Sequence, residues 1–229
     1  MEETTPCSAT ECKLLDSALA LFSEKGYKGA SIREIIEGAG VTRPVLYYYF
    51  KNKEDLFCRI VETSFAELGA DLDRVIQTPG SCRSKLKSVM STTFARAEES
   101  VGIVRLLLQA VFASPAEGLR LDMTKMVEER LGRLAKIMQE GLDAGELDGG
   151  DAESLALVFL GIMDMHIMAK MHRPKAVLAP DLADYLVDLF IKGAGGGVTS
   201  KLKSAFRPGA GSTPYKTSRN AAKNRVAER

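Results

Sequence analysis

The chain has 229 residues, of which 45% are apolar and 27% are charged, a composition typical of a soluble globular protein. Residues 1–6 lack the basic and apolar regions of a signal peptide, and the longest apolar stretch, residues 155–163, is too short to cross a membrane. These features predict a cytoplasmic protein without membrane contact. The net charge is only +1, and residues 201–229 carry eight lysines and arginines against one glutamate. The rest of the chain is therefore acidic, which excludes nucleic-acid binding through overall charge and requires a local contact surface.

The spacing of cysteines and histidines predicts no metal site. The four cysteines form no C-x-x-C pair, so we expect free thiols in a reducing compartment and leave a redox role for one of them open. They are Cys7, Cys12, Cys58 and Cys82. His166 and His172 lie on one predicted helix about 240° apart around its axis, too far apart to bind one metal ion together. Phosphate-binding loops and nucleophile motifs do not occur, so we expect neither a cofactor nor an enzyme.

Two amphipathic helices are predicted before residue 40. Apolar side chains at i, i+3, i+4 and i+7 spacing over residues 15–22 predict a helix from Thr10, its expected N-cap, to Gly26, which ends it. Ser31, with Glu34 three residues later, forms a capping box for a second helix that reaches Ala39.

A tight turn and a short third helix follow over residues 40–53. Gly40 permits the turn, Thr42 is expected to cap the helix with its hydroxyl, and Pro44 suits the first helical turn. Three short helices with a tight turn between the second and the third are typical of a DNA-binding helix-turn-helix.

The third helix contains three consecutive tyrosines, residues 47–49, which cannot all be buried. The helical period places Leu46 and Phe50 on one side and Tyr47 and Tyr48 on the other. At least Tyr48 must face solvent, where its ring and hydroxyl could contact a sugar, a thymine methyl group or a phosphate. A buried aromatic cluster is the alternative interpretation.

This arrangement resembles the N-terminal domain of the tetracycline-repressor (TetR) family. The resemblance covers residues 10–60 and rests on many positions in a fixed order. The segments that carry it are Ala20-Leu21-Phe22, Gly26-Tyr27, Ser31-Ile32-Arg33-Glu34-Ile35, Ala39-Gly40-Val41, Leu46-Tyr47-Tyr48-Tyr49-Phe50 and Lys51-Asn52-Lys53-Glu54-Asp55-Leu56. It implies a third helix that enters the major groove, a homodimer that binds a palindromic operator in double-stranded DNA, and a C-terminal helical domain that senses a small molecule.

The resemblance also implies which side chains face DNA. Arg43 is the best candidate for reading a base, because an arginine can bind a guanine edge through two hydrogen bonds. A solvated surface arginine is the alternative. Ser31 and Lys53 are expected to contact the DNA backbone, and Tyr49 stands where the family frequently has a histidine. The complete expected interface consists of Ser31, Arg33, Thr42, Arg43, Pro44, Val45, Tyr47, Tyr48, Tyr49 and Lys53.

The remaining pattern predicts six further helices. Their expected ranges are 53–77, 81–99, 101–112, 116–142, 155–171 after a cap at Asp151, and 181–192. The predicted fold class is therefore all-α, with a three-helix helix-turn-helix domain over residues 10–52 and an effector-binding and dimerisation domain over residues 53–193. Residues 1–9 and the basic tail, residues 194–229, are expected to be disordered. A tail without a role in DNA binding is the preferred interpretation.

The last two predicted helices, within residues 151–172 and 181–192, are expected to form a homodimer interface. The first of them is apolar around nearly its whole circumference, so it must be buried on more than one side. The resemblance implies a four-helix interface here, and a symmetric dimer suits a palindromic site. The alternative is that these helices only close the core of the monomer.

The resemblance places an effector cavity among the middle helices. Its candidate lining residues are Met90, Phe94, Leu107, Phe112, Met123, Met126, Met163, His166 and Met168. Methionine adapts to irregular ligands, but core packing is the preferred interpretation for any single methionine and also for His166.

The sequence thus predicts a ligand-responsive transcriptional regulator, a repressor that a small, largely apolar inducer releases from its operator. The alternative is a helical ligand-binding or protein-interaction protein whose N-terminal module does not read DNA. Salt dependence separates the two, because DNA binding weakens steeply as salt rises and apolar protein contacts do not.

Overall fold

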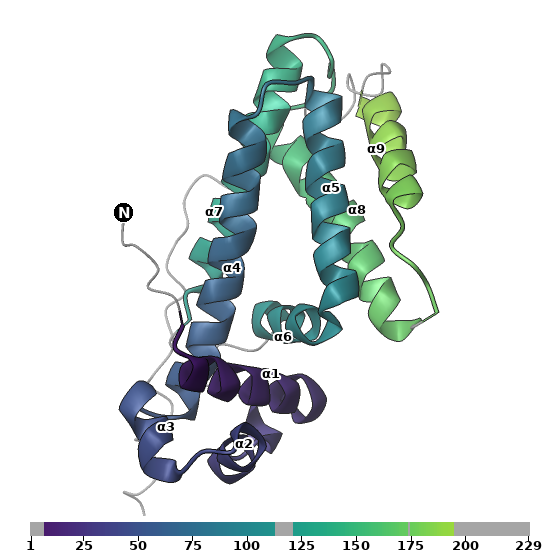
Figure 1. The fold of residues 1–229 in the computed structure, drawn as a ribbon. Helices are drawn as coiled ribbons and strands as arrows, with labels where there is room; N and C mark the ends of the chain where they lie inside the picture. The colour runs from purple at the N-terminus through teal and green to yellow at the C-terminus, as the bar shows by residue number, and fades with distance from the viewer. Residues whose placement is uncertain (1–6, 113–120, 174, 195–229) are drawn as a thin grey trace, which may run out of the picture.

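The computed structural model describes residues 7–112, 121–173 and 175–194, and every regular element within these ranges is a helix (Figure 1). This confirms the predicted all-α fold. The helices are α1 (Ala9–Gly29), α2 (Ile32–Ala39), α3 (Arg43–Tyr49), α4 (Lys53–Gln77), α5 (Cys82–Glu99), α6 (Val101–Phe112), α7 (Met123–Asp143), α8 (Ala152–His172) and α9 (Pro180–Ala194). Helices α4, α5 and α6 occupy the expected ranges to within a single residue.

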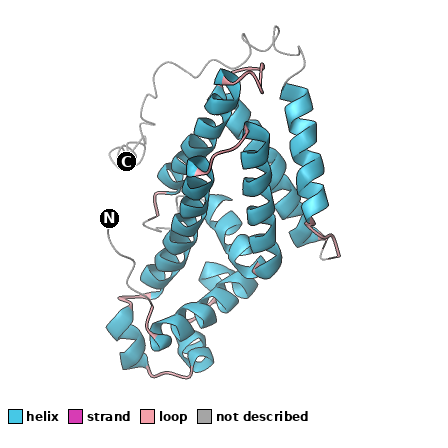
Figure 2. Cartoon of the chain, turned by 45° about the horizontal axis from the view of Figure 1, so that its top comes forward, coloured by secondary structure: helices cyan, strands magenta, loops and turns pink. Residues whose placement is uncertain are grey.

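The helices form two packed groups that α4 and α6 connect. Figure 1 shows α1, α2 and α3 together at one end, with α4 running from them along the rest of the molecule and α6 lying between α1 and the lower end of α5. In the second group α7 packs against α4 and α8, and α9 packs against α5. Figure 2 shows from another direction that loops join these long helices end to end.

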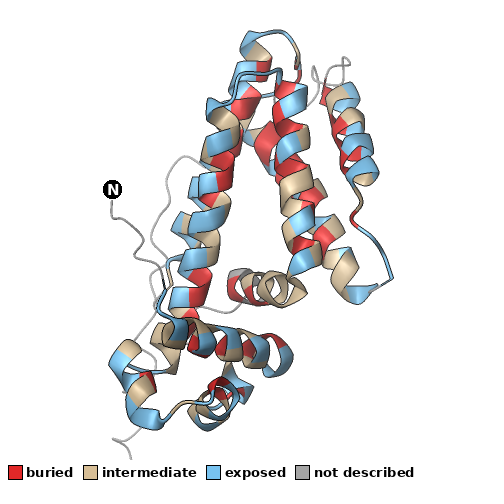
Figure 3. Cartoon of the chain, viewed as in Figure 1, coloured by how far each residue is buried: buried red, intermediate tan, exposed pale blue. Residues whose placement is uncertain are grey.

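Two hydrophobic cores underlie this arrangement, and their buried residues line the inner faces of the helices (Figure 3). The N-terminal core includes the fully buried side chains of Phe22, Ile35, Leu46 and Leu56. Helix α4 contributes to this core as far as Val61 and to the second core through Leu72. Leu106 of α6 also lies in the N-terminal core. The packing is therefore continuous across residue 52, and the domain boundary placed there stays a prediction.

Helix α1 begins at Ala9, and its N-cap is Ser8 rather than the expected Thr10. The Ser8 hydroxyl oxygen accepts a hydrogen bond from the Glu11 amide at 3.2 Å, which satisfies one free donor of the first turn. Gly26 interrupts the helix as expected, with a φ of +73° that side chains with a Cβ rarely adopt.

Helix α7 begins later than predicted, because Asp122 caps it. The Asp122 carboxylate accepts a hydrogen bond from the Lys125 amide at 3.0 Å, and residues 121–122 are not helical. The expectation of a continuous helix from residue 116 is therefore wrong at these positions. Residues 1–6, 113–120 and 195–229, which include most of the two segments expected to be disordered, lie outside the described residues.

Two of the four cysteines are bonded to each other, contrary to the expectation of free thiols. Cys7 and Cys12 form a disulfide across the start of α1, with their Cα atoms 5.8 Å apart. The turn at the Ser8 cap brings Cys7 close to the first turn of the helix, where Cys12 lies. The spacing of the two cysteines in the sequence does not by itself predict this closeness. Cys58 and Cys82 take no part in this disulfide, and burial raises the pKa of Cys82 to about 12, so the Cys82 thiol is poorly reactive.

Helix α8 is the one helix of the described ranges that is long and apolar enough to cross a membrane. A core helix of a soluble protein meets the same criterion, so this is weak evidence for a membrane span. The helix packs on α7 and buries Leu155, Phe159 and Met163. We therefore interpret it as a core helix.

Two glycines of α7 provide a matched test of its packing against α5. A Cβ at Gly141 would lie 2.6 Å from Sγ and 2.8 Å from Cβ of Cys82, whereas a Cβ at Gly132 would meet no atom within 4 Å. We expect Gly141→Ala to lower the free energy of unfolding by about 1–3 kcal/mol through overpacking. Gly132→Ala should raise it by about 0.5–1 kcal/mol through helix propensity. Urea unfolding followed by circular dichroism measures both, and a Gly141→Ala protein as stable as the wild type would contradict the close contact.

Candidate nucleic-acid interface and effector cavity

The short helix α3 is held in place by its one buried face. The side chains of Leu46 and Phe50 are 0% and 4% exposed and belong to the N-terminal core. Gly40 ends α2 in the left-handed conformation, with a φ of +65°, and the Val41 amide bonds back to the Ile36 carbonyl oxygen. Because α3 has only 7 residues, it is too short to be stable alone and depends on this packing.

The opposite face of α3 carries aromatic side chains that are exposed to solvent. Tyr48 is 82% and Tyr47 is 45% exposed, which confirms the predicted orientation of the helix. The Arg43 guanidinium lies 5.8 Å from the centroid of the Tyr47 ring, and the rings of Tyr48 and Tyr49 pack edge to face at 5.0 Å. An arginine beside exposed phenol rings forms a surface that can contact base edges, sugars and phosphates.

Thr42 occupies the N-cap position of α3, but its side chain makes no capping hydrogen bond. The expectation of a hydroxyl cap is therefore wrong. Pro44, the second helical residue, lacks an amide hydrogen, so one of the two donors that an N-cap side chain can use is missing. Thr42, Arg43 and Pro44 are exposed, and Val45 is partly buried.

The start of α2 is fixed by the predicted capping box. The Ser31 hydroxyl oxygen accepts from the Glu34 amide at 3.2 Å, and the Ser31 amide donates to the Glu34 carboxylate at 3.0 Å. The Lys25 ammonium donates to the same carboxylate at 2.7 Å and, together with Ser31, lowers the pKa of Glu34 to about 2. Arg33 pairs with Glu37 at 2.8 Å and its side chain is 85% exposed. Both expected contact residues therefore lie at the surface.

Lys53 points toward the protein interior rather than toward solvent. Its ammonium donates hydrogen bonds to the carbonyl oxygens of Tyr27 and Ala30 at 2.7 and 2.8 Å, and it lies 4.6 Å from the centroid of the Tyr27 ring. Burial lowers the pKa of Lys53. These contacts tie the start of α4 to the end of α1, a structural role that competes with the expected phosphate contact.

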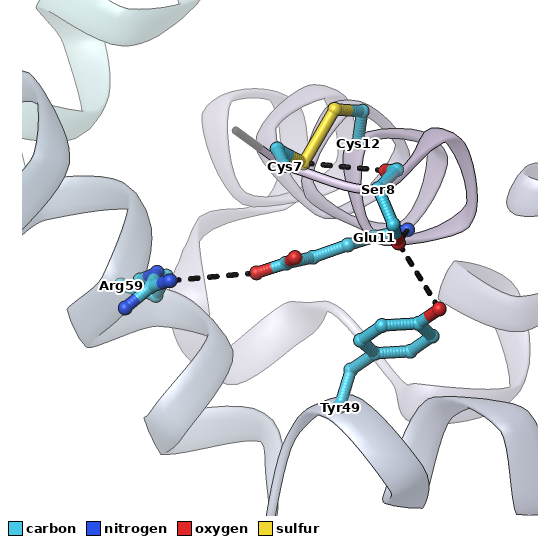
Figure 4. The surroundings of a disulfide bond; sticks show 6 residues. All are labelled: Cys7, Ser8, Glu11, Cys12, Tyr49 and Arg59. Atoms are coloured by element: carbon cyan, nitrogen blue, oxygen red, sulfur yellow. Dashed lines mark hydrogen bonds and ion pairs between the residues drawn. A yellow bond between two sulfur atoms is a disulfide. The ribbon is translucent and has the colours of Figure 1, made fainter. Parts of the chain in front are cut away.

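Figure 4 shows how Tyr49, the last residue of α3, is tied to the start of α1. The Ser8 hydroxyl donates a hydrogen bond to the Tyr49 hydroxyl oxygen at 3.0 Å. Glu11 of α1 pairs with Arg59 of α4 at 3.5 Å, and the disulfide at the start of α1 lies beside the same turn. Tyr49 therefore helps to position α3 on α1, unlike the exposed tyrosine that precedes it.

A cavity of about 470 Å³ lies between α4, α5, α6, α7 and α8, and most of its lining side chains are apolar. Leu107 and Met168, two of the expected lining residues, contribute to its wall. Met163 lines a smaller neighbouring pocket, and the side chain of Phe112 lies outside the described residues. The others pack in the two cores or bond within their own helix: Met90, Phe94, Met123, Met126 and His166.

The charged side chains on the cavity wall were missed by the sequence analysis. Arg130 of α7 donates hydrogen bonds to the Asp164 carboxylate of α8 at 3.0 and 3.2 Å, and both residues line the cavity. Elsewhere on the wall, Arg96 of α5 donates to Asp71 and Glu67 of α4 at 2.6 and 3.1 Å. The lone aspartate within the apolar α8 was a signal that could have revealed the first pair, whereas Arg130 lies in an ordinary charged surface pattern.

Within the part of the chain that the structure describes, no group of three or more histidine, cysteine, aspartate or glutamate side chains is placed to hold a metal ion. The cavity wall presents apolar side chains and the ion-paired side chains of Arg130 and Asp164.

The chain is similar to known bacterial regulators. Residues 14–60 match the bacterial regulatory proteins of the tetR family. The HTH-type transcriptional regulator AcrR of Shigella flexneri is 40% identical over 82 residues, which are 35% of this chain and only 38% of AcrR. The fatty acid metabolism regulator protein of Bacillus subtilis is 24% identical over 184 residues, which are 79% of this chain and 93% of that protein.

Solved structures share the fold over most of the chain. FadR from Bacillus subtilis, in complex with stearoyl-CoA, superposes with a TM-score of 0.70 at 23% identity and covers 81% of this chain and 99% of FadR. The TetR family regulator PfmR from Thermus thermophilus superposes with a TM-score of 0.67 at 22% identity. The superposition covers 78% of this chain and 97% of PfmR. The chain thus contains a segment, residues 14–60, that matches the tetR family of bacterial regulatory proteins, and it shares its fold with FadR and PfmR.

Proposed function

We propose that this chain is a cytoplasmic, homodimeric transcriptional repressor that a small, largely apolar ligand releases from a palindromic operator. The observation that carries the DNA-binding role is the exposed face of α3, where Tyr47 and Tyr48 accompany Arg43 on a helix whose other face is fixed in the core. Arg43 reads a base edge, and Tyr48 contacts the sugar or a phosphate. The relatives AcrR and the fatty acid metabolism regulator are regulators, which supports a regulatory rather than a catalytic role.

Exposed apolar side chains on α8 and α9 support the dimer. Val158 of α8 is 55% exposed, and Tyr185 and Leu189 of α9 are 63% and 54% exposed. Exposed apolar side chains on these two helices are costly to leave in water, and a second copy of the chain would cover them. A two-fold axis at these helices would also present two α3 helices to the two halves of a palindrome.

The position of α6 supports a response to ligand. Ile103 and Val104 line the cavity, while Leu106 on the same helix is buried in the N-terminal core. The Arg105 guanidinium donates a hydrogen bond to the Ser23 carbonyl oxygen of α1 at 3.2 Å. A ligand that prefers a shifted α6 therefore moves α1 and α3 and lowers the affinity for the operator. FadR, which shares the fold, was solved with stearoyl-CoA, and this supports an acyl compound as the ligand class.

Selection of random duplex DNA by the full-length protein at near-physiological salt tests the DNA-binding role. We expect an enriched palindrome for the wild type and its loss with Tyr48→Ala. Arg43→Ala should cost about 1–3 kcal/mol of binding free energy and relax the preference at one base pair of each half-site. Lys136→Ala, an exposed cationic side chain on α7, is the matched control and should behave as the wild type. Unchanged selection with both α3 variants would favour the alternative in which the N-terminal module serves protein contacts.

Lys53→Met tests whether this lysine is structural or contacts DNA. Because its ammonium bonds to the carbonyl oxygens of Tyr27 and Ala30 at the end of α1, we expect a lower melting temperature and an unchanged slope of log affinity against log salt concentration. A phosphate contact would instead reduce that slope by about one unit and leave the melting temperature unchanged. Thermal unfolding and binding to the selected duplex at several salt concentrations distinguish the two.

Leu189→Glu tests the dimer interface. A buried, unpaired carboxylate should dissociate the dimer into folded monomers and weaken operator binding, because each monomer reads only one half-site. Thr124→Glu, on the exposed side of α7, should leave the dimer intact. Sedimentation velocity measures both variants, and a Leu189→Glu protein that remains dimeric would place the interface elsewhere.

A further inference from the structure

The ion pair on the cavity wall joins Arg130 of α7 to Asp164 of α8, and the two side chains differ in their exposure to solvent. The Arg130 side chain is 16% exposed, and the Asp164 side chain is 35% exposed. Apolar residues of α8 line the cavity within two helical turns of Asp164, and they include Leu157, Leu160 and Met168. The pair is therefore a charged site on the wall of a largely apolar cavity.

The two members of the pair respond differently to losing their partner. An arginine cannot release its proton in a protein, so a buried guanidinium needs an acceptor at all times. An aspartate side chain that is 35% exposed can turn toward solvent when its partner is taken. A cation that bound Asp164 would leave the less exposed guanidinium of Arg130 without a partner, whereas an anion that bound Arg130 would leave only the more exposed carboxylate without one.

The remaining charges on the cavity wall do not offer the same exchange. Arg96 is held by Asp71 at 2.6 Å and by Glu67 at 3.1 Å, and the Asp71 side chain is only 11% exposed. A ligand anion at Arg96 would have to displace a buried carboxylate. Glu99, at the end of α5, is exposed. Among the described contacts, Arg130 is thus the cavity arginine with an exchangeable partner.

We propose that the effector is an amphiphile with an apolar chain and an anionic head group, a carboxylate, and that this head group replaces Asp164 at the Arg130 guanidinium. The chain lies along the aliphatic wall of the cavity, whose volume of about 470 Å³ is suited to a ligand of this size. The planar guanidinium binds a carboxylate through two parallel hydrogen bonds. Binding also removes the bridge between α7 and α8, so that ligand occupancy changes how these two helices are held together. This inference rests on the proposed role of the cavity as the effector site.

Three probes of equal chain length test the head-group preference: decanoate, decanol and decyltrimethylammonium, each below its critical micelle concentration. Equilibrium dialysis against the full-length protein measures their dissociation constants. We expect decanoate to bind at least about tenfold more tightly than decanol, because it gains a charge-assisted bond, and decyltrimethylammonium to bind most weakly.

Variants of the pair should change the preference in opposite directions. Arg130→Met should reduce the affinity for decanoate to that for decanol, while Asp164→Asn should increase it, because the arginine then lacks its protein carboxylate. Arg133→Met is the matched control, since this arginine lies on the same helix and pairs with Asp73 at 3.1 Å. It should keep the wild-type preference, and circular dichroism checks that each variant is folded.

Several outcomes would overturn the inference: equal binding of decanoate and decanol, tightest binding of the cation, an unchanged preference in a folded Arg130→Met protein, or no binding of any probe. The proposed function fails separately. If decanoate binds as expected but leaves the affinity for the selected duplex unchanged, the head-group assignment stands and the ligand-responsive repressor does not.

Discussion

Helix α6 packs against the N-terminal core on one side and lines the cavity on the other. This packing connects the N-terminal helices to the helices that surround the cavity. Leu106 is fully buried in the N-terminal core, while Val104 lines the cavity. Gly102 lies so close to α1 that a Cβ there would be 3.2 Å from the Ser23 hydroxyl oxygen. Protein interiors are close-packed, so α6 cannot shift at the cavity without repacking against α1. The same contacts that give the N-terminal core its density also link it to the cavity.

The position of the surface that we assign to DNA binding depends on the packing of α3 and α4 against α1. The recognition helix is fastened by Leu46 and Phe50 in the core and by the bond from Ser8 to Tyr49. Lys53, the first residue of α4, donates hydrogen bonds to the carbonyl oxygens of Tyr27 and Ala30 at the end of α1. Helices α3 and α4 are therefore both attached to α1, and a displacement of α1 carries the exposed tyrosines and Arg43 with it. In a dimer, such displacements alter the spacing of two recognition helices on one DNA duplex.

Local signals were sufficient to predict most helices and the orientation of α3. The capping box at Ser31 and the cap at Asp151 involve residues three positions apart, so their geometry can be read from the sequence. The facing of Tyr48 follows from helical period alone. The role of Lys53 could not be predicted in this way, because its partners are backbone carbonyl oxygens of a helix distant in the sequence.

The cavity between α4, α5, α6, α7 and α8 was the least predictable part of the structure. An apolar residue at helical spacing shows the same pattern whether it faces a core, as Met90 and Phe94 do, or a cavity, as Leu107 does. The charged site formed by Arg130 and Asp164 arises only when α7 and α8 pack together. The disulfide at the start of α1 likewise depends on the turn that brings its two cysteines together.

The central claim is that filling the cavity lowers the affinity of α3 for DNA. The most direct test measures the affinity of the wild-type protein for the selected duplex with the cavity empty and with the cavity saturated by decanoate, at one salt concentration. We expect the affinity to weaken by about 5- to 150-fold, the usual range of coupling between two sites, and we expect an equal loss of decanoate affinity when the protein is bound to DNA. An unchanged affinity for the duplex while dialysis shows bound decanoate would contradict it.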